Sequence, residues 1–148
     1  MNGKKITADV YPGPYLSTWK VRQKWQDWTE IDAFFPMLYT KVFNTPVRWI
    51  GKTTAEGTFY LASKKKLLIP GLYIPGMNEV DFRKGVNLVF KYGAYGISVF
   101  ELGHMNPRYW QILFEEAGPY LLGKSPNATT GIDSLRSKFL AQVPKSSP

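Results

Sequence analysis

The chain has 148 residues, of which 44% are apolar and 16% aromatic, so it suits one domain with a hydrophobic core. It has no cysteine and one histidine, which excludes disulfide bonds, thiolate metal sites and histidine-rich metal sites. The net charge of +8 permits contact with an anionic partner, but the basic residues are scattered and no nucleic-acid-binding motif occurs.

We therefore expect no nucleic-acid partner and no bound metal or cofactor. No apolar run reaches the roughly 20 residues that cross a bilayer, so no membrane span is expected. The N-terminal residues 1–5 lead almost directly into a predicted strand, and we expect no signal peptide.

The first predicted strand covers residues 6–10, and Pro12 and Pro14 end it, because proline cannot donate a hydrogen bond to a sheet. Ser17 or Thr18 is expected to cap a helix over residues 19–28. We assign the tryptophans of that helix to packing.

The second predicted strand, residues 31–38, is apolar without alternation, as in a strand covered on both faces. A hydroxyl cap and a proline at 45–46 then begin a helix over residues 47–62. Gly51 and Gly57 are expected to weaken this helix.

The third predicted strand covers residues 67–73, and Pro70 inside it indicates an edge, a bulge or a strand end. Asn78 is expected to cap the next helix, with acidic residues in its first turn. That helix is predicted to run to Tyr92 and to stop at Gly93.

The fourth predicted strand covers residues 94–100. An asparagine–proline pair at 106–107 begins a helix that is expected to end at residue 117. Beyond it the pattern weakens, and residues 132–143 are compatible with a short helix.

The alternation of strands and helices predicts an α/β fold in which four consecutive βα units share a parallel sheet. A complete TIM-type (β/α)8 barrel needs about 250 residues, so four units correspond to half of one. We expect the half-barrel domain at residues 1–117. Residues 118–148 are expected to form a C-terminal loop and short helix with a frayed tail.

Five segments resemble the last four βα units of bacterial glycoside hydrolase-like barrels related to family 10. They are residues 9–14 (DVYPGP), 22–28 (RQKWQDW), 32–39 (DAFFPMLY), 71–75 (GLYIP) and 96–100 (GISVF). The resemblance implies a Bacteroides-type bacterial protein that is secreted, periplasmic or at the cell surface, and that has a carbohydrate partner. It also implies that the first four strands are missing, so the isolated half is expected to be inactive. Its free strand edges predict a homodimer or pairing with the missing N-terminal half-barrel.

Active sites of such barrels lie at the carboxyl ends of the strands. Glycoside hydrolysis normally needs two carboxyl groups, for which the candidates are Glu101 and Asp9. The candidate substrate-binding residues are Tyr11, Tyr39, Tyr73 and His104, because phenols and aromatic rings can contact sugar hydroxyls and sugar faces.

Structural roles compete with each of these assignments. Glu101 is equally suited to capping the fourth helix or pairing with a lysine, and Asp9 to holding the turn before Pro12. The tyrosines can close the top of the core, and His104 can be a plain exposed loop residue. Three functions follow: hydrolysis or binding of a glycan by the complete protein, a non-enzymatic glycan-binding or scaffold module, and, more weakly, a basic binder of anionic polymers.

Overall fold

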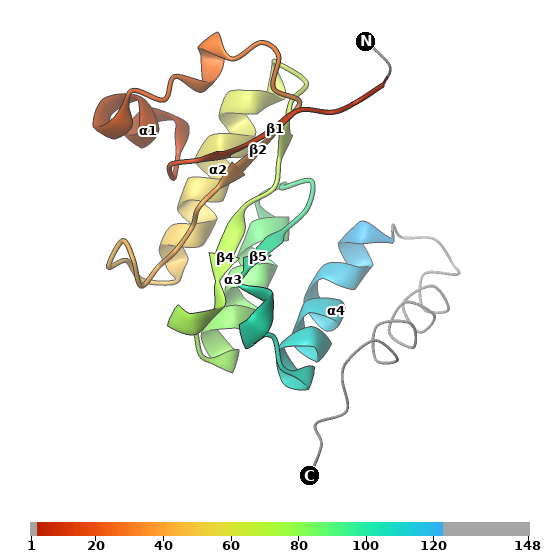
Figure 1. Ribbon diagram of the computed structural model, residues 1–148. Helices are drawn as coiled ribbons and strands as arrows, with labels where there is room; N and C mark the ends of the chain where they lie inside the picture. The colour runs from red at the N-terminus through yellow and green to blue at the C-terminus, as the bar shows by residue number, and fades with distance from the viewer. Residues whose placement is uncertain (1–2, 123–148) are drawn as a thin grey trace.

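The computed structural model describes residues 3–122 (Figure 1). Strands alternate with helices along this part of the chain. In order, the elements are β1 (Thr7–Val10), α1 (Pro14–Val21), the 3-10 turn η1 (Trp25–Asp27), β2 (Ala33–Pro36), α2 (Arg48–Ala62), β3 (Leu67–Leu68), β4 (Gly71–Tyr73), η2 (Ile74–Gly76), α3 (Glu79–Lys91), β5 (Ser98–Phe100), η3 (Leu102–His104) and α4 (Pro107–Leu121).

The strands are parallel and follow one another in sequence order. β1 pairs with β2 and β2 with β3, while β4 pairs with β5. A parallel bridge between Met37 and Gly71 joins the two sheets, and the Leu38 N–H donates to the Gly71 carbonyl at 2.8 Å. β3 and β4 are the two parts of one extended segment, interrupted at Pro70. The predicted parallel α/β architecture is therefore confirmed.

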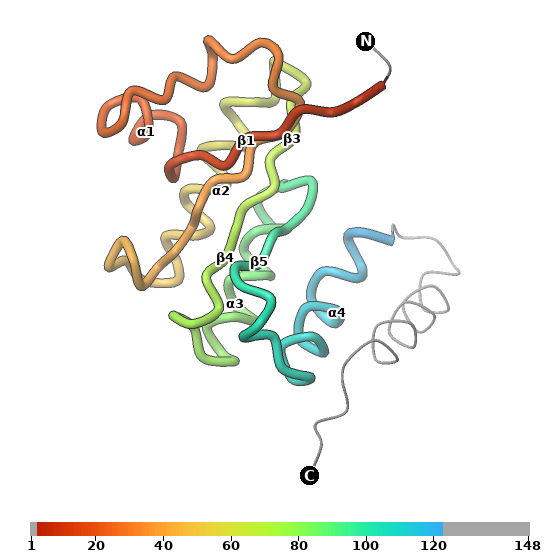
Figure 2. Tube along the Cα trace, in the orientation of Figure 1, coloured from red at the N-terminus to blue at the C-terminus, as the bar shows by residue number. Residues whose placement is uncertain are grey.

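Side chains alternate between two unlike faces of the sheet. One face packs against the helices, and its buried members include Val10, Phe34, Leu68 and Leu72. Figures 1 and 2 show α2 and α3 lying behind the sheet, with α4 beside α3. The opposite face, which we call the open face, is less well covered by the described chain, and its partly or fully exposed residues are Asp9, Phe35, Tyr39, Ile69, Tyr73, Ser98 and Phe100.

The prediction for the first helix was wrong. The helix begins at Pro14, with Gly13 as its N-cap at φ 72°, and ends before Arg22, which has the left-handed φ of 60°. The hydroxyls of Ser17 and Thr18 donate back to the Pro14 carbonyl and cap nothing. Pro14 had been read only as a strand terminator, whereas its fixed φ also suits the first turn of a helix.

α3 and α4 begin where their caps predicted. Asn78 accepts a hydrogen bond from the Asp81 N–H, and Asn106 accepts from the N–H groups of Arg108 and Tyr109. α2 begins at Arg48, near the predicted start, but its N-cap Val47 makes no side-chain hydrogen bond. The Thr45 hydroxyl has no partner among the described residues, so the expected hydroxyl cap was wrong. α4 continues past the expected end at residue 117. The expected short helix at 132–143 lies outside the described residues.

Close contacts explain why glycines occur inside α2 and α3. A Cβ atom on Gly51 of α2 would lie 2.8 Å from the Cε2 atom of Tyr92. A Cβ on Gly85 of α3 would lie 3.2 Å from the Cδ1 atoms of both Ile50 and Leu72, which are fully buried. The two helices therefore approach their neighbours so closely that a side chain would not fit without movement.

We predict that Gly85→Val lowers the free energy of unfolding by about 1–3 kcal/mol, because it overpacks a closed part of the core. Urea denaturation measures this change. The matched control is Lys84→Val on the adjacent exposed position, which is expected to cost less than about 1 kcal/mol from helix propensity alone. Equal losses in the two variants would contradict the packing described for Gly85.

Candidate functional site

Three aromatic side chains gather at the carboxyl ends of three neighbouring strands. Tyr39 follows β2, Tyr73 ends β4 and Phe100 ends β5. Their ring centroids are 5.4 Å apart for Tyr39 and Tyr73, 5.9 Å for Tyr39 and Phe100, and 6.0 Å for Tyr73 and Phe100. We call these residues the aromatic cluster.

Sheet register produces this cluster. Tyr73 is paired with Phe100 across β4 and β5, so their side chains leave the sheet at the same level and on the same face. Tyr39 is two residues beyond Met37, which bridges to Gly71, two residues before Tyr73. Parallel strands in register thus bring three residues that are far apart in sequence into contact on the open face.

The cluster combines apolar rings with two phenols in a partly covered position. Phe100 is 50% exposed, and Tyr39 and Tyr73 are half-buried. The pKa of Tyr39 is raised, first by burial and then by the negative charge of Asp9 and the nearby Tyr73. Asp9 itself is exposed on the same face, so a carboxylate accompanies the rings.

Tyr11, the other candidate tyrosine, lies apart from the cluster. Its ring packs edge-on against Phe43 at 5.1 Å, and its backbone N–H donates to the Gln23 side chain at 2.7 Å. Phe43 in turn contacts Trp49 near the start of α2. Tyr11 therefore connects the turn after β1 to the loop after β2.

Glu101 and His104 form a pair of their own beyond β5. The His104 Nδ1 atom lies 3.0 Å from the Glu101 Oε1 atom, and both side chains are about half exposed. Asn106, not Glu101, caps α4. The register that pairs Tyr73 with Phe100 gives Phe100 the position that the sequence had suggested for Glu101. Side chains of a strand alternate between its two faces, so Ser98 and Phe100 share one face and Glu101 does not. This alternation is the sequence signal that could have identified Phe100.

The two candidate carboxylates lie at opposite edges of the sheet. Asp9 is in β1, and Glu101 directly follows β5. β1 and β5 are three strand spacings apart in the sheet order, which corresponds to roughly 14 Å. Paired glycosidase carboxylates are about 5–10 Å apart. The strand spacing therefore argues against Asp9 and Glu101 as a catalytic pair.

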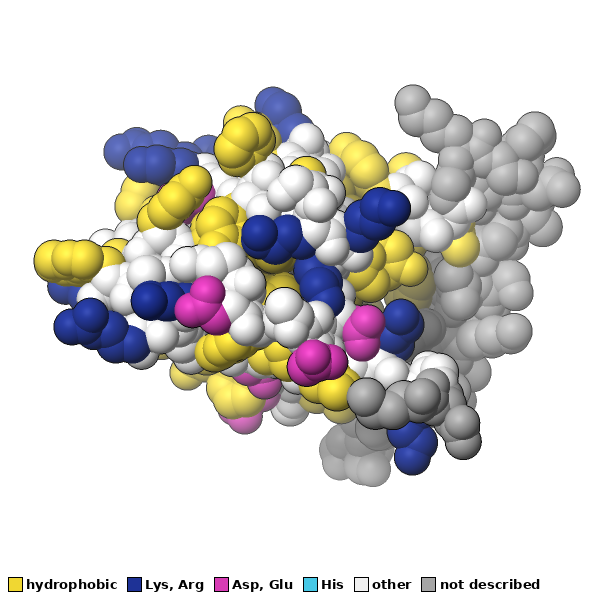
Figure 3. Space-filling model, turned by 90° about the horizontal axis from the view of Figure 1, so that it is seen from above, with side chains coloured by type: hydrophobic (Ala, Val, Ile, Leu, Met, Phe, Trp, Pro, Cys, Tyr) yellow, Lys and Arg dark blue, Asp and Glu magenta, His cyan; other side chains and the backbone are white. Residues whose placement is uncertain are grey.

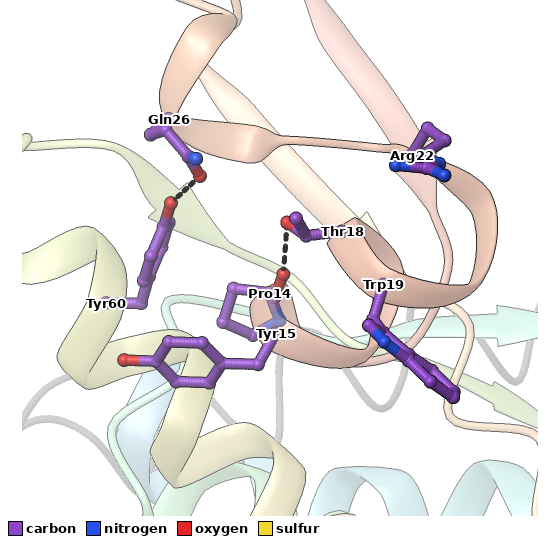
Figure 4. A pocket seen from close by; sticks show the side chains of 7 residues that line it. All are labelled: Pro14, Tyr15, Thr18, Trp19, Arg22, Gln26 and Tyr60. Carbon is purple, nitrogen blue, oxygen red and sulfur yellow. Dashed lines mark hydrogen bonds between the residues drawn. The ribbon is translucent and has the colours of Figure 1, made fainter.

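A pocket of about 460 Å³ beside α1 is a second place where aromatic side chains meet polar ones (Figure 4). Tyr60 donates a hydrogen bond to Gln26 and packs edge-on against Tyr15 at 5.8 Å. Figure 4 shows the Trp19 ring turned away from both tyrosines. The rings consequently share no common face, and we regard this pocket as secondary.

A basic patch, a metal site and a membrane-spanning helix are the other features that could mark a function in the described residues outside the aromatic cluster. Viewed from above, Lys and Arg side chains are dispersed among hydrophobic and acidic ones and form no continuous stripe on that face (Figure 3). Within residues 3–122, no His, Asp and Glu side chains gather in a group of three that could hold a metal ion. In the same part of the chain, none of the helices combines the length and apolarity needed to cross a membrane.

Comparisons of the chain with protein-family models, with curated proteins and with solved structures found no match.

The environment of Tyr39 makes a prediction about its titration. Because its pKa is raised in the folded state, the neutral phenol favours the fold. That contribution is complete below about pH 10 and is lost as the pH rises through the folded pKa. We expect Asp9→Asn to lower the Tyr39 pKa, as followed by the ¹³Cζ chemical shift of labelled tyrosine. Asp27→Asn, which removes a charge near Tyr60 instead, should leave Tyr39 unchanged. An unchanged Tyr39 pKa in the Asp9→Asn variant would contradict the proximity of the two groups.

Proposed function

We propose that this chain is a glycan-binding α/β module and that the aromatic cluster, together with Asp9, contacts the sugar. The observation that carries the proposal is the meeting of Tyr39, Tyr73 and Phe100 on the open face. Aromatic rings offer an apolar surface for the C–H face of a sugar, and phenols offer hydrogen bonds to its hydroxyls. A carboxylate beside them adds a strong acceptor.

We further propose that the sheet is half of a β/α barrel of the glycoside hydrolase-like type. Sequential parallel order and helices packed on one face support this. The partly exposed apolar residues of the open face would then line the barrel interior. The resemblance in the sequence implies a secreted, periplasmic or cell-surface location for such a protein.

Binding without hydrolysis is the activity we propose for the chain alone. The separation of Asp9 and Glu101 argues against a catalytic pair formed by these two residues. Hydrolysis by the complete protein would need a different pairing of carboxylates from this one.

The binding proposal is tested by applying the labelled chain to an oligosaccharide array and titrating the best oligosaccharide by calorimetry. We expect Phe100→Ala to weaken binding about tenfold, the equivalent of about 1.4 kcal/mol, because it removes the most exposed ring of the cluster. Phe59→Ala is the control, since Phe59 is 79% exposed on α2. Equal weakening by both variants, or no binding to any oligosaccharide, would refute the proposal.

The half-barrel proposal predicts concentration-dependent dimers, because the open face and the sheet edges remain free to pair. Sedimentation equilibrium measures them. Ile69→Lys places a charge on the open face and is expected to weaken the dimer at least tenfold. Val80→Lys, at a position 75% exposed on α3, should leave it unchanged. A monomer at all concentrations would count against the proposal.

A further inference from the structure

A polar pocket of about 520 Å³ opens at the carboxyl end of the sheet, between the loop after β2 and the first turns of α2 and α3. The loop is tightly closed, because the Thr45 N–H donates to the Thr40 carbonyl at 2.9 Å and Asn44 adopts a left-handed φ of 48°. The pocket is lined by Thr40, Lys41, Asn44, Thr45, Pro46, Val47, Arg48, Gly76, Asp81 and Lys84.

Three cations from three different elements line this pocket. Lys41 comes from the loop, Arg48 from the start of α2 and Lys84 from α3. None of the three forms an ion pair with any residue between 3 and 122. Asp81 is the one acidic residue of the lining, so the pocket carries a net charge of +2, from three positive charges and one negative.

The backbone adds to this positive character. The N-cap of α2, Val47, makes no side-chain hydrogen bond, and the first turn of the helix contains no acidic residue. The dipole of a helix start favours an anion, whereas the Trp49 and Ile50 N–H groups of this turn already donate to the Pro46 and Val47 carbonyls. The Thr45 hydroxyl is also buried without a hydrogen-bond partner among the described residues. One polar group of the lining, the Thr45 hydroxyl, is thus unsatisfied near the three unpaired cations.

The pocket adjoins the aromatic cluster. A Cβ atom on Gly76 would lie 2.6 Å from the Cβ of Lys41 and 3.3 Å from the Cδ1 of Tyr73. The alkyl stem of Lys41, a pocket residue, and the ring of Tyr73, a cluster residue, therefore both approach the single point where a Gly76 side chain would begin. A ligand lying across Gly76 would meet both.

We propose that this pocket binds an oxyanion carried by the glycan, so that the ligand is an acidic oligosaccharide bearing a sulfate ester or a carboxylate. The oligosaccharide part of this inference rests on the function proposed above. The oxyanion part does not, because inorganic sulfate is a sufficient probe of the pocket. Comparing sulfated with uronate-bearing oligosaccharides shows whether the pocket prefers a sulfate ester or a carboxylate.

The first experiment titrates the full chain with sodium sulfate at constant ionic strength, balanced with sodium chloride, and follows backbone amides by NMR. We expect saturable shifts at residues 40–45, 47, 48 and 84. Arg48→Gln and Lys84→Gln should each weaken sulfate binding about fivefold by removing one cation. Lys52→Gln, one turn further along α2 and outside the pocket, is the matched control. No saturable shift, or equal effects of the three variants, would overturn the pocket as an anion site.

The second experiment compares one sulfated, one uronate-bearing and one neutral oligosaccharide of equal length. Tighter binding of at least one acidic ligand, lost in Arg48→Gln and retained in Lys52→Gln, supports the proposal. Equal binding of all three would overturn the acidic ligand class while leaving the glycan function intact. Sulfate binding without binding of any oligosaccharide would overturn the glycan function and leave the anion pocket standing.

Discussion

The packing of α2 and α3 against one face of the sheet is the constraint on which the rest of the molecule depends. Phe34, Leu68 and Leu72 are removed from water on that face, at about 25 cal/mol for each Å² of apolar surface. Parallel sheets normally have both faces covered. Here the described chain covers only one, and the side chains of the other face remain partly exposed. The candidate site lies on that second face.

The parallel βα arrangement also determines where functional side chains can come together. Each strand returns through a helix, so the carboxyl ends of the strands and the amino ends of the helices lie at one end of the molecule. The aromatic cluster is built from the strand ends and the cationic pocket from the helix starts and the loop before α2. The two are neighbours because the segment from Tyr73 to Gly76 leads directly from the end of β4 to the pocket wall.

Local chemistry was enough to predict most of the framework. The side chains of Asn78 and Asn106 fix helix starts through contacts within three residues, and the missing N–H of Pro70 interrupts its strand regardless of the surroundings. Pro14 was misread because proline suits both a strand end and a helix start. The choice between them depends on Gly13 adopting a positive φ, which the residue types alone do not reveal.

The candidate site was only partly predictable, because it depends on register and on contacts between distant segments. Tyr39 and Tyr73 were identified as strand-end residues, and they do meet. Phe100 was passed over in favour of Glu101, since a shift of one residue exchanges the two faces of a strand. The cationic pocket brings together residues from positions 40 to 84, and nothing in their local sequence relates Lys41 to Lys84.

The absence of a side chain at Gly76 has a consequence for ligand length. A Cβ atom at position 76 would lie 2.6 Å from the Lys41 Cβ and 3.3 Å from the Tyr73 Cδ1, so the lysine stem and the ring edge converge where that side chain would begin. A methyl group at this point would force at least one of the two residues to move. Substituting position 76 therefore offers a way to change the spacing between the pocket and the aromatic cluster, and with it the length of ligand that reaches both.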